Sequence, residues 1–239
     1  AMKDESFKER LLSEEPAVDK NHMIYTLMTA FDKQFPMDNI PNYEPPIEAS
    51  IAGIAKSSNK PVMEVMYEEL LKNDGKTFVW APFAPYPDHN LDFYKMIMEF
   101  ESSVAGLSDG GAHCGLICDA SMPTWNISHW TKDRVKGDKI PLEFLVRKQT
   151  KETAETFGLM DRGQLKEGYM ADINIIDHEN LCVYKPEMVH DLPTGSRRII
   201  QKAGGYIATI KSGVVTFKND EATGALPGTL IRGEQAAHA

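Results

Sequence analysis

Residues 106–113 read Gly-Leu-Ser-Asp-Gly-Gly-Ala-His, and at this point an apolar run gives way to an acid, two glycines and a histidine. Val104–Leu107 has the composition of a short buried strand, of the kind that is usually parallel and covered on both faces. Asp109 then lies at the carboxyl end of that strand, where ligands bind and catalytic side chains gather in α/β proteins. Gly110 and Gly111 suit a close approach of a ligand, because they have no Cβ. The pattern predicts a functional loop, although the same residues can form a turn in which the carboxylate caps nearby amides.

The sequence around this stretch predicts alternating helices and strands. Lys76–Ala81 is rich enough in β-branched and aromatic residues for a strand, and Leu91–Phe100 carries apolar residues at helical spacing. Pro123–Arg134 and Pro141–Phe157 each begin with a proline at a first-turn position, which favours a helix. Alternation of helix and strand is typical of a parallel sheet or a (β/α) barrel. Further helices are predicted at residues 23–31, 47–57 and 61–72, the last of them ended by Asn73-Asp74-Gly75.

Beyond Gly158 the apolar residues recur in short β-branched segments separated by turn residues. This pattern is typical of a small antiparallel sheet. Lys211-Ser212-Gly213-Val214 has the composition of a tight hairpin turn. We therefore expect two domains, residues 1–158 with the first pattern and residues 159–239 with the second. The predicted strands are 172–177, 181–184, 198–202, 206–211 and 214–218, followed by a tail from residue 224 that wraps the surface or frays.

The composition narrows the classes of function. The chain has 239 residues, 42% of them hydrophobic, which is enough for a sizeable core in one large or two small domains. Its net charge is -9 and its Lys and Arg are not clustered, which argues against nucleic acid as a partner. No run approaches the roughly 18 apolar residues of a membrane span, and residues 3–6 lack the apolar core of a signal peptide. We therefore expect a cytoplasmic protein without a membrane partner. Cys114, Cys118 and Cys182 form no CxxC and are expected to be reduced thiols that fill buried space.

Two segments together resemble a known enzyme family. Residues 106–123 contain Asp109, and residues 161–177 read Asp-Arg-Gly-Gln-Leu-Lys-Glu-Gly-Tyr-Met-Ala-Asp-Ile-Asn-Ile-Ile-Asp. Both look like the carboxyl-terminal part of the N-acyl-D-amino-acid deacylases, or D-aminoacylases, a branch of the metal-dependent amidohydrolase superfamily. The second segment is common to much of that superfamily, whereas the first is more specific. The similarity extends from about residue 8 to about residue 233.

The resemblance implies a fold and a site. Residues 1–158 would be the last βα units of a TIM-type (β/α) barrel and residues 159–239 part of a small β-sandwich, so the implied fold class is α/β. In the family the strand-end Asp completes the metal site and acts as general base. That role falls on Asp109, with zinc as the implied cofactor and a small N-acyl compound as the substrate. Gly110, Gly111 and His113 would contact the substrate or support the residues around the metal.

Most of the family's metal ligands have no counterpart in this sequence. Family members carry a His-x-His pair on an early strand, a bridging ligand and two further histidines on middle strands. This sequence has no His-x-His, and none of its histidines has metal-ligand spacing to another. The resemblance therefore implies the carboxyl-terminal portion of such an enzyme, with Ala1 before Met2 typical of a remnant of an expression tag. Some members bind the substrate carboxylate through an Arg soon after the strand-end Asp, whereas residues 110–130 contain no Arg or Lys.

Residues that follow Asp109 allow both a functional and a structural interpretation. His113 could hydrogen-bond substrate or a neighbouring ligand, or it could be satisfied by local backbone. Asp119 and Ser121 continue a polar loop, but they are also placed to cap the next helix. Trp125 and Trp130 lie five apart on that helix, which favours the core over a substrate platform.

The sequence supports two classes of function. The first is the carboxyl-terminal portion of a zinc-dependent amidohydrolase acting on N-acyl-D-amino acids or related amides, inactive as an isolated chain because only one metal ligand is present. The alternative is a non-catalytic fragment that binds a partner chain or a small molecule. A homo-oligomer is expected, because Lys76–Ala81 lacks a recognisable upstream parallel neighbour and unpaired edges are usually paired or covered.

Overall fold

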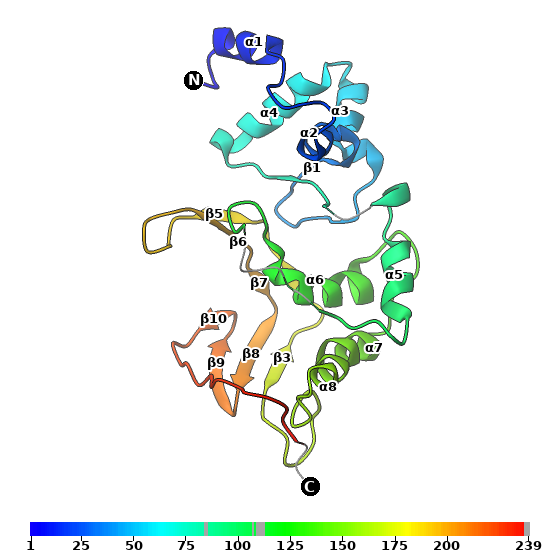
Figure 1. The fold of residues 1–239 in the computed structure, drawn as a ribbon, viewed down its shortest axis with the longest axis vertical. Helices are drawn as coiled ribbons and strands as arrows, with labels where there is room; N and C mark the ends of the chain where they lie inside the picture. The colour runs from blue at the N-terminus through cyan, green and yellow to red at the C-terminus, as the bar shows by residue number, and fades with distance from the viewer. Residues whose placement is uncertain (84–85, 107, 109–112, 237–239) are drawn as a thin grey trace. The chain divides into compact units, whose positions relative to one another are not determined.

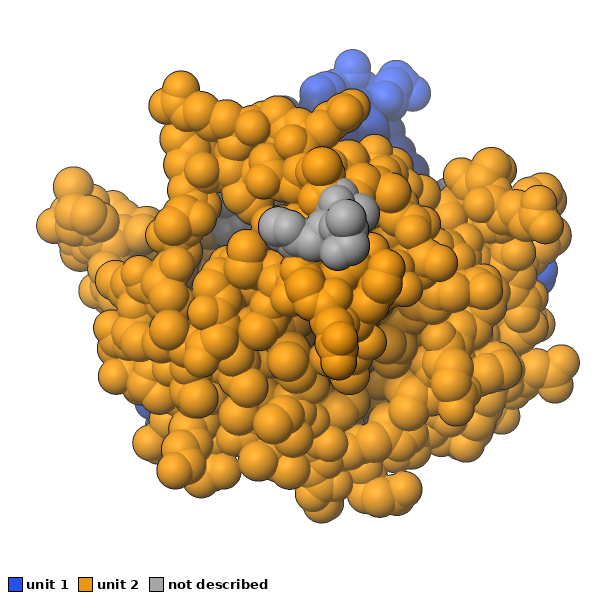
Figure 2. Space-filling view, turned by 90° about the horizontal axis from the view of Figure 1, so that it is seen from below, with its two compact units in different colours: residues 1–91 blue, residues 92–239 orange. Residues whose placement is uncertain are grey.

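The chain folds into helices and short strands in a computed structural model that describes residues 1–83, 86–106, 108 and 113–236 (Figure 1). This mixture of helix and sheet is consistent with the predicted α/β class. The chain contacts divide into two compact units, residues 1–91 and residues 92–239, which are coloured separately in Figure 2. The expected domain boundary after residue 158 stays a prediction.

Residues 1–91 are mainly helical. Their α-helices are α1 (Glu5–Ser13), α2 (Met23–Thr29), α3 (Ile51–Ser58) and α4 (Val62–Gly75), and their 3-10 helices are η1 (Phe31–Lys33), η2 (Ile47–Ala49) and η3 (Pro87–His89). The three helices predicted in this part of the chain are confirmed. Ile51 and Ala55 of α3 and Val65 of α4 form a buried apolar cluster. The helical path of α4 is broken because Asn73 and Asp74 adopt left-handed backbone angles, as their turn-forming side chains predict.

The strand predicted at Lys76–Ala81 is present as β2 (Val79–Trp80), but its pairing differs from the expected one. It pairs antiparallel with β1 (Phe35–Pro36), and the rings of Phe35 and Trp80 lie 5.6 Å apart. Val104–Gly106 forms no strand, and Leu107 lies outside the described residues. The prediction of a strand over Val104–Gly106, parallel to its neighbours, is therefore wrong. A strand exists only through hydrogen bonds to a neighbour, and Ala105 bonds to a helix side chain instead.

Residues 92–239 begin with a helical part. Its α-helices are α5 (Asp92–Glu99), α6 (Met122–Ser128), α7 (Leu142–Arg147) and α8 (Thr153–Thr156), joined by a 3-10 turn, η4 (Asp119–Ser121), and two π-helical turns, η5 (His129–Asp133) and η6 (Lys148–Glu152). The predicted helices are confirmed, each of the last two continuing through a π-turn. α6 and α7 pack against each other, and Trp130, Ile140 and Leu145 are buried.

The remainder of this unit is built from antiparallel strands, as predicted. A sheet in the order β10-β9-β8-β3 contains β3 (Ile173–Ile176), β8 (Tyr206–Lys211), β9 (Val214–Lys218) and β10 (Glu221–Ala222). Two further pairs join β4 (Cys182–Val183) to β7 (Ala203–Gly204) and β5 (Glu187–Val189) to β6 (Arg198–Ile200). Between β8 and β9, Ser212 and Gly213 have φ of 52° and 79°, the left-handed geometry of a tight hairpin turn.

The carboxyl-terminal tail returns to the turn after α8. Gln235 donates its amide to the carbonyl of Gly158, and its own carbonyl accepts from the amide of Met160. This parallel bridge supports the expectation that the tail lies along the surface. Among the helices of the described residues, none has both the length and the apolar character needed to cross a membrane.

Candidate functional site

The stretch singled out by the sequence lies partly beyond what the structure describes. Asp109, Gly110 and Gly111 fall outside the described residues, so their predicted roles stay predictions. Ser108 before them and His113 after them are the nearest described residues. The site is therefore built from the two segments that lead into and out of this stretch.

The segment that leads into the stretch is held by Lys148, the first residue of η6. Its ammonium donates to the carbonyls of Phe100, at 3.0 Å, and Ser103, at 2.7 Å, and pairs with Glu152 at 3.1 Å. Lys148 is only 4% exposed. A buried ammonium is tolerated when its donors are satisfied, and here most of that satisfaction comes from the main chain of residues 100–103.

A second residue of the same helical segment holds the next part of the chain. The hydroxyl oxygen of Thr153 lies 2.8 Å from the carbonyl oxygen of Ala105 and 2.8 Å from that of Lys148. Residues 100–105 are thus fastened to η6 and α8 by side chains rather than by a strand ladder. Sequence reasoning missed both residues, although Lys148 stands three positions after Leu145, on the apolar face of the predicted helix.

The segment that leads out of the stretch is held by main-chain hydrogen bonds. His113 has a φ of 51°, and its carbonyl accepts from the amides of Leu116, at 2.7 Å, and Ile117, at 2.9 Å. The carbonyl of Cys114 accepts from the amide of Ile199 in β6, at 2.7 Å. The side chain of His113 is exposed. Both ends of the stretch are therefore fixed, one to the helices and one to a strand.

The start of α6 is fixed to the strands as well. The Ser121 hydroxyl donates to the side-chain carbonyl of Gln201, whose amide donates to the carbonyl of Tyr184 at 2.7 Å. The Thr124 hydroxyl lies 2.6 Å from that of Tyr206 in β8. Ser121 occupies the position before α6 that a capping residue takes, but its side chain makes no cap hydrogen bond. The prediction that Ser121 caps this helix is wrong, because Ser121 has helical backbone angles (φ -82°, ψ -4°) instead of the extended angles of a capping residue.

Trp130 belongs to the core, as its spacing predicts. It is 1% exposed, and the guanidinium of Arg134 lies over its ring at 4.7 Å. Trp125 stacks on His129 with ring centroids 4.5 Å apart and planes 16° apart. Both tryptophan rings therefore contact other side chains of the protein through their faces.

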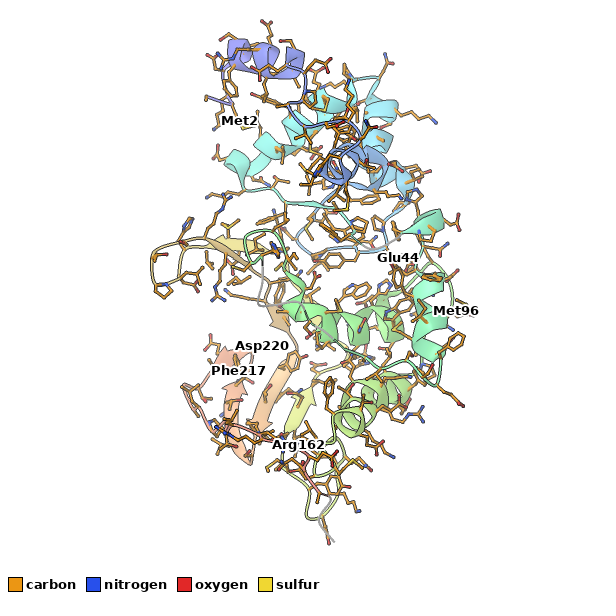
Figure 3. All side chains as sticks on the ribbon, viewed as in Figure 1. Met2, Glu44, Met96, Arg162, Phe217 and Asp220 are labelled. Atoms are coloured by element: carbon orange, nitrogen blue, oxygen red, sulfur yellow. The ribbon has the colours of Figure 1, made fainter. Side chains whose placement is uncertain are left out.

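The segment 161–177 includes β3, and its charged side chains form a network of ion pairs. Arg162, labelled in Figure 3, binds both carboxylate oxygens of Asp161, at 2.8 and 3.0 Å, and approaches Asp172 at 3.5 Å. Lys211 of β8 binds both oxygens of Asp172, at 2.9 and 3.0 Å. Partial burial raises the pKa of Asp172, but the hydrogen bonds from Lys211 and the Ser212 amide outweigh it and hold that pKa below its usual value. The charged residues of this segment therefore join it to the sheet.

Comparison of the sequence with known protein families identifies the family of this chain. The model described as "Amidohydrolase family" matches residues 88–217, which contain both the 106–123 and the 161–177 segments. The chain belongs to the amidohydrolase family. No curated protein matches it. No solved structure matches it either.

Amidohydrolases are generally metal-dependent, so a member of the family is expected to supply a set of metal ligands. Structural and catalytic zinc sites use about three or four His, Cys, Asp or Glu ligands. Within residues 1–83, 86–106, 108 and 113–236, no group of three or more such residues could hold a metal ion. The described residues do not by themselves fit the zinc site that the family resemblance implies.

The cysteines of this amidohydrolase chain are thiols rather than disulfides. Cys114, Cys118 and Cys182 are free and partly buried, which agrees with the sequence expectation of reduced thiols. Burial, with a smaller contribution from Asp119, raises the pKa of the Cys118 thiol to about 11. A thiol with so high a pKa is a poor nucleophile near neutral pH.

Proposed function

We propose that this chain is the carboxyl-terminal portion of a zinc-dependent amidohydrolase that hydrolyses N-acyl-D-amino acids or related amides. Residues 1–158 would form the last βα units of a TIM-type barrel and residues 159–239 part of a β-sandwich. The observation that carries the proposal is the amidohydrolase match over residues 88–217, which includes both segments of the resemblance. The chain would act in the cytoplasm on a small N-acyl substrate, with neither nucleic acid nor membrane as partner.

Asp109 carries the proposed chemistry. Hydrolysis of an amide needs a water to attack the carbonyl carbon and a base to take the proton of that water. A carboxylate at this position would act as the base and as one ligand of the metal. Gly110, Gly111 and His113 would lie against the substrate or the groups around it. The anchored segments on both sides support this assignment, because a base contributes only when held in a productive position.

The test compares the isolated chain with a complemented enzyme. The complemented enzyme is this chain coexpressed with the amino-terminal half of an N-acyl-D-amino-acid deacylase that carries His-x-His. With added Zn²⁺ and N-acetyl-D-amino acids, the isolated chain should show no turnover, because one carboxylate cannot hold the ion. The complemented enzyme should show turnover that a chelator abolishes.

Two outcomes would count against the proposal. Chelator-sensitive turnover by the isolated chain would show that it already contains a complete metal site. A complemented enzyme that binds zinc stoichiometrically but hydrolyses no N-acyl amino acid of either configuration would show that the proposed substrate class is wrong. That second result would favour the alternative of a non-catalytic fragment that binds a partner chain or a small molecule.

A further inference from the structure

Lys148 is a buried cation that the proposed chemistry does not use. Its ammonium lies 3.0 Å from the Phe100 carbonyl, 2.7 Å from the Ser103 carbonyl, 3.4 Å from the Ser103 hydroxyl and 3.1 Å from a Glu152 carboxylate oxygen. An ammonium has three donors, and these oxygens satisfy them. A buried Lys without such partners would be costly. The side chain is therefore suited to hold the chain of residues 100–103 in one place.

The held segment continues directly toward Asp109. Thr153 contacts the carbonyl of Ala105, four positions before Asp109. The contacts of Lys148 and Thr153 therefore hold the described chain as far as Ala105. On the far side, the Cys114 carbonyl is bonded to the Ile199 amide. Described residues on both sides of Asp109 are therefore held by hydrogen bonds.

We propose that Lys148, with Thr153, is a positioning residue that fixes the path of the chain leading to Asp109. The proposal rests on the proposed function of Asp109, but the restraint itself is a property of the chain. Lys148 acts through main-chain carbonyls, so its effect depends on an ammonium or guanidinium donor at this place. An apolar side chain of similar length would fill the space but remove the Lys148 donor from the carbonyl of Ser103. The carbonyl of Phe100 would keep only the amide and the hydroxyl of Ser103 as donors.

The experiment measures amide hydrogen exchange in the isolated chain, where no hydrolysis is needed. The variants are Lys148→Met, which removes the charge, and Lys148→Arg, which keeps donors for the carbonyls. Lys151→Met is the matched control, because Lys151 lies in the same π-turn but is 41% exposed and 3.8 Å from its partner Glu155. Exchange is followed in peptides covering residues 100–106 and, as an internal reference, the β8–β9 hairpin, together with thermal melting.

Lys148→Met should speed exchange in residues 100–106 by about tenfold or more, and leave the β8–β9 hairpin within about threefold. Lys148→Arg should restore most of the protection, and Lys151→Met should not change it. In the complemented enzyme Lys148→Met should lower kcat with little change in KM, and Lys148→Arg should recover it.

Unchanged exchange of residues 100–106 in Lys148→Met would overturn the proposal, as would faster exchange over the whole chain with no rescue by Arg. If Lys148→Met does not fold, Thr153→Val takes its place, because it removes only the hydroxyl that reaches Ala105. That variant must also speed exchange in residues 100–106 for the proposal to stand. Failure of the proposed function would appear as absent turnover in the unmutated complemented enzyme, with the exchange results unaffected.

Discussion

Asp109 and His113 have different proposed duties, and substitution by asparagine separates them. In the complemented enzyme Asp109→Asn should keep the fold and lower kcat by roughly 10²–10⁴, because an amide cannot accept the proton of water. His113→Asn should lower activity by only about 10–100-fold if His113 supports groups around the metal. Steady-state kinetics, with metal content and melting temperature measured for both, decide the comparison. Near-normal turnover of Asp109→Asn beside an inactive His113→Asn would refute the placement of the base.

Asp172 should make stability depend on pH. Because its folded pKa lies below the unfolded value of about 4, the ion pair with Lys211 stabilises the fold above that pH. The contribution is lost as pH falls through the folded pKa. Asp172→Asn should therefore lower the free energy of unfolding by about 1 kcal/mol at pH 7, and the difference from wild type should shrink toward pH 3.

Urea unfolding between pH 3 and pH 7 measures this difference. Asp191→Asn is the control, because the Asp191–Arg198 pair is even closer, at 2.7 and 2.6 Å, but more exposed, with side chains 49% and 41% accessible. Exposed pairs contribute less, so the control should show a smaller loss at pH 7. A loss for Asp172→Asn that stays constant across the whole pH range would contradict the electrostatic explanation.

The sequence predicts part of the candidate site through local pattern alone. Asp109 followed by two glycines is visible in five residues, and no fold is needed to notice it. The role of Asp172 could not be found in this way, because Lys211 stands 39 positions away and meets it only once β3 and β8 pair. Lys148 could be placed on the inner face by spacing, but its carbonyl partners, 45 and 48 positions away, could not.

Elements were predictable where their own residues decide them. β8 and β9 have the predicted bounds because β-branched residues flank a two-residue turn that favours left-handed angles. β7 (Ala203–Gly204) and β10 (Glu221–Ala222) were not predicted, since their residues have low strand propensity and they exist only as partners of β4 and β9. Val104–Gly106 shows the reverse case: its residues suit a strand, but no strand among the described residues pairs with it.

The turn at Gly163 is closed tightly against η6, and a matched pair of glycines tests this. Gly163 and Gly213 have φ of 82° and 79°, so alanine at either position should carry a similar backbone strain of about 1 kcal/mol. At Gly163 a Cβ would also lie 2.9 Å from the Thr150 carbonyl oxygen, whereas at Gly213 it would meet nothing within 4 Å. Gly163→Ala should therefore destabilise the chain by at least about 1 kcal/mol more than Gly213→Ala. Chemical unfolding measures both, and equal losses would show that η6 yields to the added methyl group.

The whole chain is expected to self-associate. Large apolar side chains are strongly exposed, among them Leu226, Leu165 and Phe217, the last labelled in Figure 3. β3 is also the last strand of its sheet, and such edges are usually paired or covered. Light scattering at micromolar concentration should therefore give a mass above the monomer value of 26.7 kDa. A monomeric mass over the whole concentration range would exclude the homo-oligomer.

Because Lys148 is buried, the reactivity of its amine can report on local opening of the structure around it. An amine-reactive reagent needs a deprotonated, accessible nitrogen, and this nitrogen is surrounded by oxygen acceptors and reached by almost no solvent. Lys148 can therefore be acylated only when η6 separates from residues 100–103. The rate at which Lys148 is labelled, compared with the rate at the readily accessible Lys151, would therefore measure how often this separation occurs.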